Sequence, residues 1–127
     1  MIEPLRASNE ISDTKSFEWK LFSENADKVE ASAKVAFETD GKIEEIEKLD
    51  ALILLSPPNA DFINSRSVGL IRRLERHGCT IGAVSGGVFL LAKAKVRPNI
   101  RYSVPVSYTH LRAHETRGNL VCRLLLE

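Results

Sequence analysis

Two continuous apolar runs constrain the fold of this 127-residue chain more than any other feature. Residues 50–55 read DALILL, and residues 80–84 read TIGAV. Unbroken apolar runs of this length are typical of strands that are buried on both faces of a parallel sheet. Because parallel strands need a long crossover connection, we expect a helix between the two runs.

The segment between the runs has the periodicity of an amphipathic helix. Over residues 60–77 apolar side chains recur at helical spacing, the arginines fall on other faces, and Gly78 can end the helix. A second helix is predicted over 88–95 and a last strand over 100–104. This alternation of strands and helices predicts an α/β fold with a mostly parallel sheet and right-handed crossovers.

The first fifty residues carry weaker patterns. A helix is predicted over residues 2–11. Residues 17–23 alternate between apolar and charged side chains, which predicts a half-buried strand with Phe17 and Trp19 in the core. Two further short elements are predicted, a strand over 35–38 and an acidic helix over 42–48.

The composition, 43% hydrophobic and 28% charged, is ordinary for a soluble globular protein. No apolar run approaches the roughly 20 residues that a membrane helix needs. The first residues, MIEPLR, lack the apolar core of a signal peptide. We therefore expect a cytoplasmic protein without a membrane partner.

The last residues of the chain resemble translated sequencing adapter. Residues 106–116 (VSYTHLRAHET) back-translate to a transposase mosaic end followed by a short-read library adapter, and residues 120–127 (LVCRLLLE) back-translate to its flow-cell end. The two matches share one reading frame and are separated by a plausible index length. The alternative is a genuine strand followed by a leucine-rich helix. We expect residues 105–127 to be a non-native tail.

Setting the tail aside changes the charge and the candidate ligands. It removes three arginines and two glutamates from totals of 18 and 17, leaving 15 basic and 15 acidic side chains and no electrostatic footprint for nucleic acid. His110 and His114 have the i, i+4 spacing of two metal ligands on one helix face. Because adapter codons explain that spacing, and Cys79 and Cys122 form no metal or disulfide motif, we predict no metal and no cofactor.

The turn Ser85-Gly86-Gly87, between the TIGAV run and the next helix, is where the sequence best indicates chemistry. A sharp strand-turn-helix lifts one side chain above the carboxyl edge of the sheet. The N–H groups at the start of the helix can hold an anion or oxyanion. Ser85 has that position, although an ordinary α/β connection also contains a strand, a glycine-rich turn and a helix.

Four segments in a matching order carry a family resemblance. They read EPLRASN (3–9), FEWKLFSENADKVEAS (17–32), DALILL (50–55) and GAVSGGVFLLAKA (82–94). Over residues 2–104 the chain resembles the N-terminal ligand-sensing domain of AraC-type transcription regulators, which is built on the PfpI-protease and class I glutamine amidotransferase-like fold. The resemblance implies a three-layer, flavodoxin-like sandwich.

The resemblance also implies that residues 1–104 are a partial domain. The family's domain starts with a strand that is absent here, and further elements and a pair of DNA-binding helix-turn-helix units should follow. The implied parent is a homodimeric regulator that binds a small-molecule metabolite and contacts DNA only through its C-terminal domain.

The turn Ser85-Gly86-Gly87 corresponds to the strand-to-helix elbow that carries the nucleophile in catalytic relatives. Departures from the family pattern predict that this elbow is not catalytic. Ser85 stands where catalytic relatives have cysteine, and a serine needs a base to become a nucleophile. His77, the one histidine before the tail, ends the preceding helix. Pro57 and Pro58 replace glycines of the oxyanion region and have no N–H. The alternative is a PfpI-type hydrolase or glyoxalase-like enzyme with Ser85 as the nucleophile.

The candidate ligand-binding residues combine the elbow with the first helix. Glu3 matches a glutamate that reaches the elbow in the superfamily, although it could equally be a carboxylate that the helix dipole stabilises. Asn9 matches the same motif and could also cap a loop. The predicted set is Glu3, Asn9, Ser56, Ser85, Gly86 and Gly87.

Overall fold

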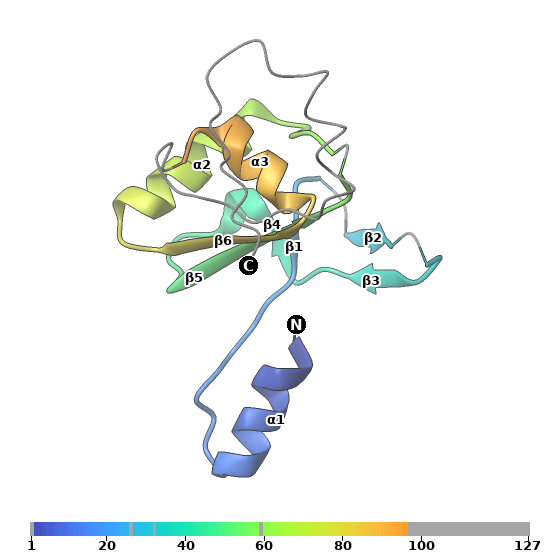
Figure 1. The fold of residues 1–127 in the computed structure, drawn as a ribbon, viewed down its shortest axis with the longest axis vertical. Coiled ribbons are helices and arrows are strands. Elements are labelled where there is room, and N and C mark those ends of the chain that lie inside the picture. Colours follow the sequence, from blue (N-terminus) through green and yellow to red (C-terminus); the bar gives the residue numbers. More distant parts are fainter. Residues whose placement is uncertain (1, 26, 32, 59, 97–127) are drawn as a thin grey trace, which may run out of the picture. The chain divides into compact units, whose positions relative to one another are not determined.

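The computed structural model describes residues 2–25, 27–31, 33–58 and 60–96 (Figure 1). The strand predicted over 100–104 and the tail predicted over 105–127 lie outside these residues. The chain divides into two compact units, one up to Glu45 and one from Ile46 onward.

The first unit opens with helix α1 (Ile2–Ser12), which confirms the predicted helix. It contains no buried residue, so packing contributes little to it. Its surface carries an ion-pair network instead. The Arg6 guanidinium lies 2.9 Å from the Glu3 carboxylate and also pairs with Glu10. These carboxylates raise the pKa of Arg6, and the hydrogen bond with Glu3 is the largest cause.

Two small sheets follow α1 in the first unit. Strand β1 (Phe22–Ser23) pairs with β4 (Gly41–Lys42) in parallel, and β2 (Lys28–Glu30) pairs with β3 (Ala36–Glu38) antiparallel. Strand β3 confirms the strand predicted over 35–38, whereas β2 was not predicted. The helix predicted over 42–48 is reduced to a single 3-10 turn, η1 (Ile43–Glu45).

The strand predicted over 17–23 is wrong for most of its length, because only β1 has strand pairing. The reason is that side chains bind the backbone here. The N–H and the carbonyl of Phe17 both bond to the Asn9 side chain, and the N–H of Leu21 donates to the Asp40 carboxylate at 2.7 Å. Phe17 and Trp19 are 43% and 37% exposed, so the prediction that they lie in the core is also wrong.

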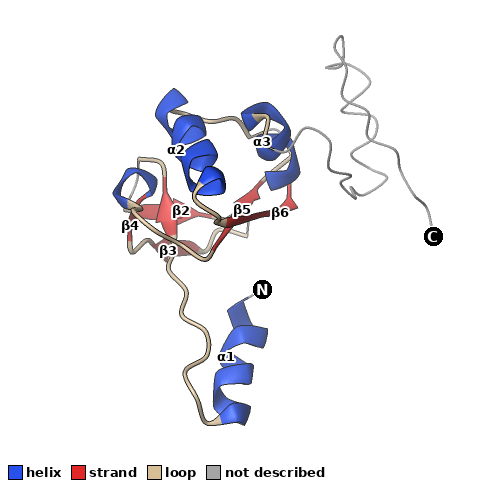
Figure 2. Ribbon diagram, turned by 90° about the vertical axis from the view of Figure 1, so that its left-hand side faces the viewer, coloured by secondary structure: helices blue, strands red, loops and turns tan. Residues whose placement is uncertain are grey.

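The second unit is a β-α-β-α arrangement in the order that the sequence predicts. Its elements are β5 (Ala51–Ser56), α2 (Ser65–Arg76), β6 (Thr80–Ser85) and α3 (Gly87–Ala94). Strands β5 and β6 pair in parallel, from Ala51 opposite Thr80 to Ser56 opposite Ser85. Figure 2 shows α2 and α3 on the same side of this strand pair.

The core of the second unit lies between the two strands and the two helices. Its buried apolar side chains are Ile46, Leu52, Leu54, Leu70, Ile71, Leu74, Cys79, Leu90, Leu91, Ala94 and Val96. Ile53, Leu55 and Val84 remain 39%, 57% and 43% exposed. Within the described residues, the prediction of strands buried on both faces is therefore wrong, because both helices cover one face.

These elements confirm the predicted α/β class. Two of the three strand pairs are parallel, and the helices and strands alternate in the second unit. The arrangement is compatible with an incomplete α/β sandwich.

Local signals at its two ends define helix α2. It begins five residues later than predicted, because the Asn64 side chain accepts a hydrogen bond from the N–H of Arg66 at 2.9 Å and caps the helix. At the other end Gly78 has φ +88°, and its N–H donates to the carbonyl of Glu75 at 3.0 Å. A left-handed glycine after the last helical residues confirms the predicted stop.

Replacing Ser67 with alanine should raise the free energy of unfolding by about 1 kcal/mol. Ser67 is 1% exposed in α2, and its hydroxyl has no hydrogen-bond partner among the described residues. A buried hydroxyl without a partner costs about 1–3 kcal/mol of desolvation, and alanine removes that cost. Urea titration followed by circular dichroism measures the change. Ser65→Ala, at an exposed site of the same helix, is the control, and equal effects of the two substitutions would contradict this prediction.

Candidate ligand-binding elbow

The turn between β6 and α3 has the backbone of a strained elbow. Ser85, the last residue of β6, has φ +56°, a left-handed conformation that side chains with a Cβ rarely adopt. Such residues cost of order 1–3 kcal/mol each and persist where the surroundings enforce them. The Ser85 side chain is exposed at the carboxyl end of its strand.

The two glycines after Ser85 show what enforces this conformation. A Cβ on Gly86 would lie 2.0 Å from the carbonyl oxygen of Pro57, and a Cβ on Gly87 would lie 2.2 Å from that of Leu54. The N–H of Gly86 donates to the carbonyl of Ser56 at 2.9 Å. The elbow is therefore packed against the backbone at the end of β5, at a distance that only glycine allows.

Ser56 and Ser85 place two hydroxyl groups at the same edge of the sheet. They are register partners in the parallel pair of β5 and β6, so they lie side by side at the carboxyl ends of their strands. The Ser56 hydroxyl donates to its neighbour's carbonyl, that of Pro57, at 3.2 Å. Ligands of open α/β sheets bind at this edge.

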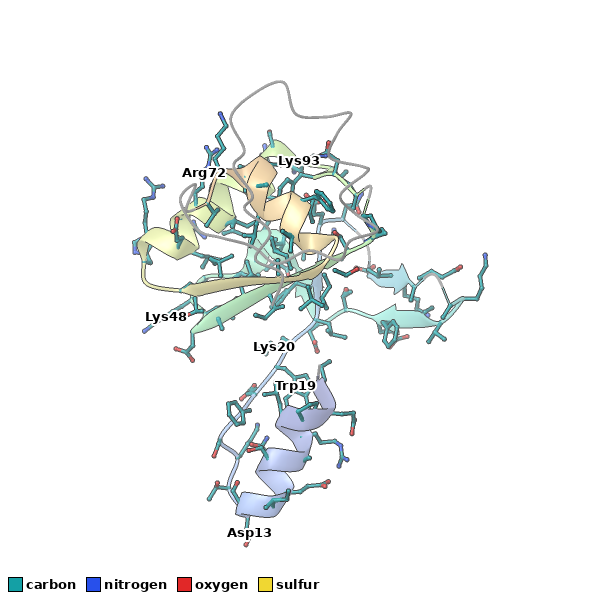
Figure 3. All side chains as sticks on the ribbon, in the orientation of Figure 1. Asp13, Trp19, Lys20, Lys48, Arg72 and Lys93 are labelled. Carbon is teal, nitrogen blue, oxygen red and sulfur yellow. The ribbon has the colours of Figure 1, made fainter. Side chains whose placement is uncertain are left out.

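An ion pair connects the segment after β5 with α3. Lys93 Nζ on α3 lies 2.9 Å from Asp61 Oδ2, and the N–H of Phe62 donates to Asp61 Oδ1 at 2.8 Å. The hydrogen bond from Lys93, followed by that from Phe62, holds the pKa of the Asp61 carboxyl below its ordinary value. Lys93 is labelled on α3 in Figure 3. No sequence pattern indicated this pair, because its members are 32 positions apart.

The structure keeps His77 away from the elbow. His77 is the C-cap residue of α2 and lies just before β6, whereas Ser85 ends that strand. At about 3.3 Å per strand residue, the six residues of β6 separate the two by roughly 20 Å. Among the described residues there is no other histidine.

Cys79 is equally unsuited to be a nucleophile in this arrangement. Its side chain is 2% exposed, and burial raises the pKa of the thiol. Burial disfavours the thiolate, which is the reactive form, so Cys79 is an unreactive small core residue.

Glu3 and Asn9 belong to the first unit, whereas the other four predicted site residues belong to the second unit. Glu3 is exposed and pairs with Arg6. Asn9 uses both ends of its carboxamide on one residue: Nδ2 donates to the carbonyl of Phe17 at 2.8 Å, and Oδ1 accepts from its N–H at 2.9 Å. Asn9 therefore organises the segment after α1, which is the loop-capping alternative that the sequence left open.

The described residues contain no group of three or more His, Cys, Asp and Glu side chains that could hold a metal ion. None of their helices combines the length and the apolar character that crossing a membrane requires.

Comparison with known proteins relates the chain to transcriptional regulators. No family model matches it. Over 96 residues it is 30% identical to the HTH-type transcriptional regulator CdhR of Pseudomonas aeruginosa, a match that covers 73% of this chain and 28% of the length of that relative.

A solved structure has the same fold. The crystal structure of a candidate transcriptional regulator protein from Vibrio parahaemolyticus superposes with a TM-score of 0.74 at 19% identity, covering 89% of this chain and 61% of that one. The chain is therefore similar in sequence to a part of an HTH-type transcriptional regulator, and it shares its fold with a protein described as a transcriptional regulator.

Proposed function

We propose that this chain is part of the ligand-sensing domain of an AraC-type transcription regulator, and that a small metabolite binds at the elbow formed by Ser85, Gly86 and Gly87. The observation that carries the proposal is the strained φ of +56° at Ser85. Glycines packed on the backbone of β5 hold this conformation. Strain of this kind gathers at functional sites, because it is not needed to connect a strand to a helix.

The chemistry of the elbow favours binding over catalysis. A serine becomes a nucleophile only with a base beside it, and His77, the one histidine of the described residues, lies at the other end of β6. Pro57, whose carbonyl faces the elbow glycine, has no N–H to offer an oxyanion. The hydrolase alternative therefore lacks a histidine base beside Ser85 and an oxyanion donor at Pro57 within the described residues.

The elbow can recognise a polar ligand through two kinds of group. The Ser85 hydroxyl can donate or accept a hydrogen bond, and the first N–H groups of α3 can donate to a carboxylate or carbonyl oxygen. The neighbouring Ser56 adds a second hydroxyl at the same edge. We expect Glu3 and Asn9 to complete the site only if the first unit approaches the elbow in the parent protein.

The rest of the proposal concerns the parent protein. The chain spans 28% of the length of CdhR, which is named as an HTH-type regulator. We infer that DNA binding resides in a helix-turn-helix region beyond this chain, that the parent is a cytoplasmic homodimer, and that the ligand changes its activity at a promoter.

Replacing Ser85 with glycine should abolish the ligand response without harming the fold. Glycine adopts positive φ without strain, so the free energy of unfolding of the 127-residue chain should stay equal or rise by up to about 1 kcal/mol. A thermal-shift screen of the parent protein identifies the metabolite that raises its melting temperature. In the Ser85→Gly variant of the parent protein, that metabolite should no longer raise the melting temperature. Ser65→Ala, at an exposed position of α2, should leave that rise intact.

Two outcomes would overturn the proposal. One is a metabolite-induced rise in melting temperature that Ser85→Gly leaves unchanged, because the ligand would then bind elsewhere. The other is a parent protein that no metabolite stabilises.

A further inference from the structure

A second candidate site lies away from the elbow, between the exposed side of α2 and the end of α3. It is a groove of about 430 Å³ lined by Gly69, Arg72, Glu75, Arg76 and Lys95. Figure 3 labels Arg72 on α2. Three cationic side chains and one carboxylate give the lining a net charge of +2. Residues 46–96 as a whole carry seven basic and four acidic side chains, a net charge of +3.

Two of the basic residues lie close enough to repel each other. Arg72 and Arg76 are four residues apart on α2, and the repulsion of like charges at that spacing is about 0.2–0.5 kcal/mol, while Arg76 in the last turn also complements the helix dipole. Lys95 adds a third positive charge from the end of α3, where it has φ +52°. An anion in the groove would turn this repulsion into attraction.

Gly69 is the second unexplained feature of the same helix face. It lies three residues before Arg72, in the interior of α2, where glycine costs about 1 kcal/mol relative to alanine. A Cβ at Gly69 would meet nothing within 4 Å, so packing does not require glycine there. Its effect is to keep the groove open.

Arg72 is already oriented. Its Nε donates to the carbonyl of Ala94 at 2.7 Å, which ties the guanidinium on α2 to the last turn of α3 with one of its five N–H groups. A planar, pre-oriented guanidinium suits the paired oxygens of a phosphate group and needs less ordering on binding.

We propose that the groove of Arg72, Arg76 and Lys95 binds a phosphate oxyanion, either on a small phosphorylated ligand or on the backbone of a nucleic acid. The guanidinium of Arg72 contacts the oxyanion, Arg76 and Lys95 supply the further charge, and Gly69 leaves the space. This site is independent of the elbow, because it uses α2 and the C-terminal end of α3, whereas the elbow precedes the start of α3.

Calorimetric titration of the full 127-residue chain with inorganic pyrophosphate at low salt tests the proposal. The double substitution Arg76→Gln with Lys95→Gln should weaken binding about tenfold or more, because it removes two of the three charges. Arg66→Gln with Lys48→Gln removes two charges of the same unit outside the groove lining, and it should change binding by less than about twofold.

The substitution Gly69→Gln tests whether Arg72, Arg76 and Lys95 bind an anion or only stabilise the helices. Glutamine favours the helix over glycine, so the melting temperature should rise, while its side chain fills the groove and pyrophosphate binding should fall. If the cations only complement the helix dipole, Gly69→Gln should leave binding unchanged.

A short duplex DNA of arbitrary sequence distinguishes the two sources of phosphate. A small ligand is supported if pyrophosphate binds and the groove substitutions weaken its binding. A nucleic acid backbone is supported if only the duplex binds and its binding depends on Arg76 and Lys95 in the same way. Failure of both probes to bind, or binding that the double substitution does not weaken, would overturn the proposal.

Discussion

Gly87→Ala should destabilise the second unit by about 3 kcal/mol or more, at the upper end of what overpacking costs. The added Cβ would lie 2.2 Å from the carbonyl oxygen and 2.7 Å from the carbonyl carbon of Leu54. These are backbone atoms of β5, so they cannot rotate away as a side chain would. Relief requires α3 to move off the strand, and that movement would expose Leu90 and Leu91, which are buried on α3.

Urea titration followed by circular dichroism measures this loss, and Gly69→Ala is the matched control. Both substitutions add one methyl group to a helical glycine, but the Cβ at Gly69 meets nothing within 4 Å. Gly69→Ala should therefore raise the free energy of unfolding by about 1 kcal/mol, in the opposite direction. Similar effects of the two substitutions would mean that the close approach of α3 to β5 is absent in solution.

Ile71→Ala should lower the free energy of unfolding by about 2–5 kcal/mol. Ile71 has no exposed surface and lies on α2, the helix that packs with α3 over the sheet. Truncation removes buried methyl groups and leaves a cavity, because the backbone of a helix between two packed neighbours cannot collapse into the space.

The same urea titration on Ile63→Ala provides the comparison. Ile63 is 69% exposed, so the same change in composition removes little buried area and should cost less than about 0.5 kcal/mol. If Ile71→Ala were as mild as Ile63→Ala, the core between α2 and the β5–β6 pair would not be formed in solution.

The elbow has the geometry of a nucleophile site without the groups that make a nucleophile. Ser85 has a strained, left-handed backbone conformation, and Gly86 and Gly87 allow the close packing that enforces it. Neither the thiol of Cys79 nor the ring of His77 is placed to react there. This combination is what the proposed ligand-binding role requires, because a sensor must hold its ligand unchanged.

Local patterns determined the second unit well and the first unit poorly. Residues 50–95 alternate long apolar runs with helical periodicity, so their strands and helices follow from burial alone. Residues 17–23 have an equally clear alternation, yet Asn9 and Asp40 bind their backbone and no strand forms before Phe22. A side chain eight or more positions away decides that outcome, and no local pattern records it.

The sequence by itself determined the β-α-β-α order of the second unit, the stop at Gly78 and the position of the elbow, because periodicity and turn residues act over neighbouring positions. That residues 105–127 derive from adapter stays a prediction from the sequence. Only the tertiary structure decided that both helices cover one face, that Ser85 takes a left-handed conformation, and that Gly86 meets Pro57. These features depend on close contacts between segments some 30 positions apart, and such contacts exist only once the chain is packed.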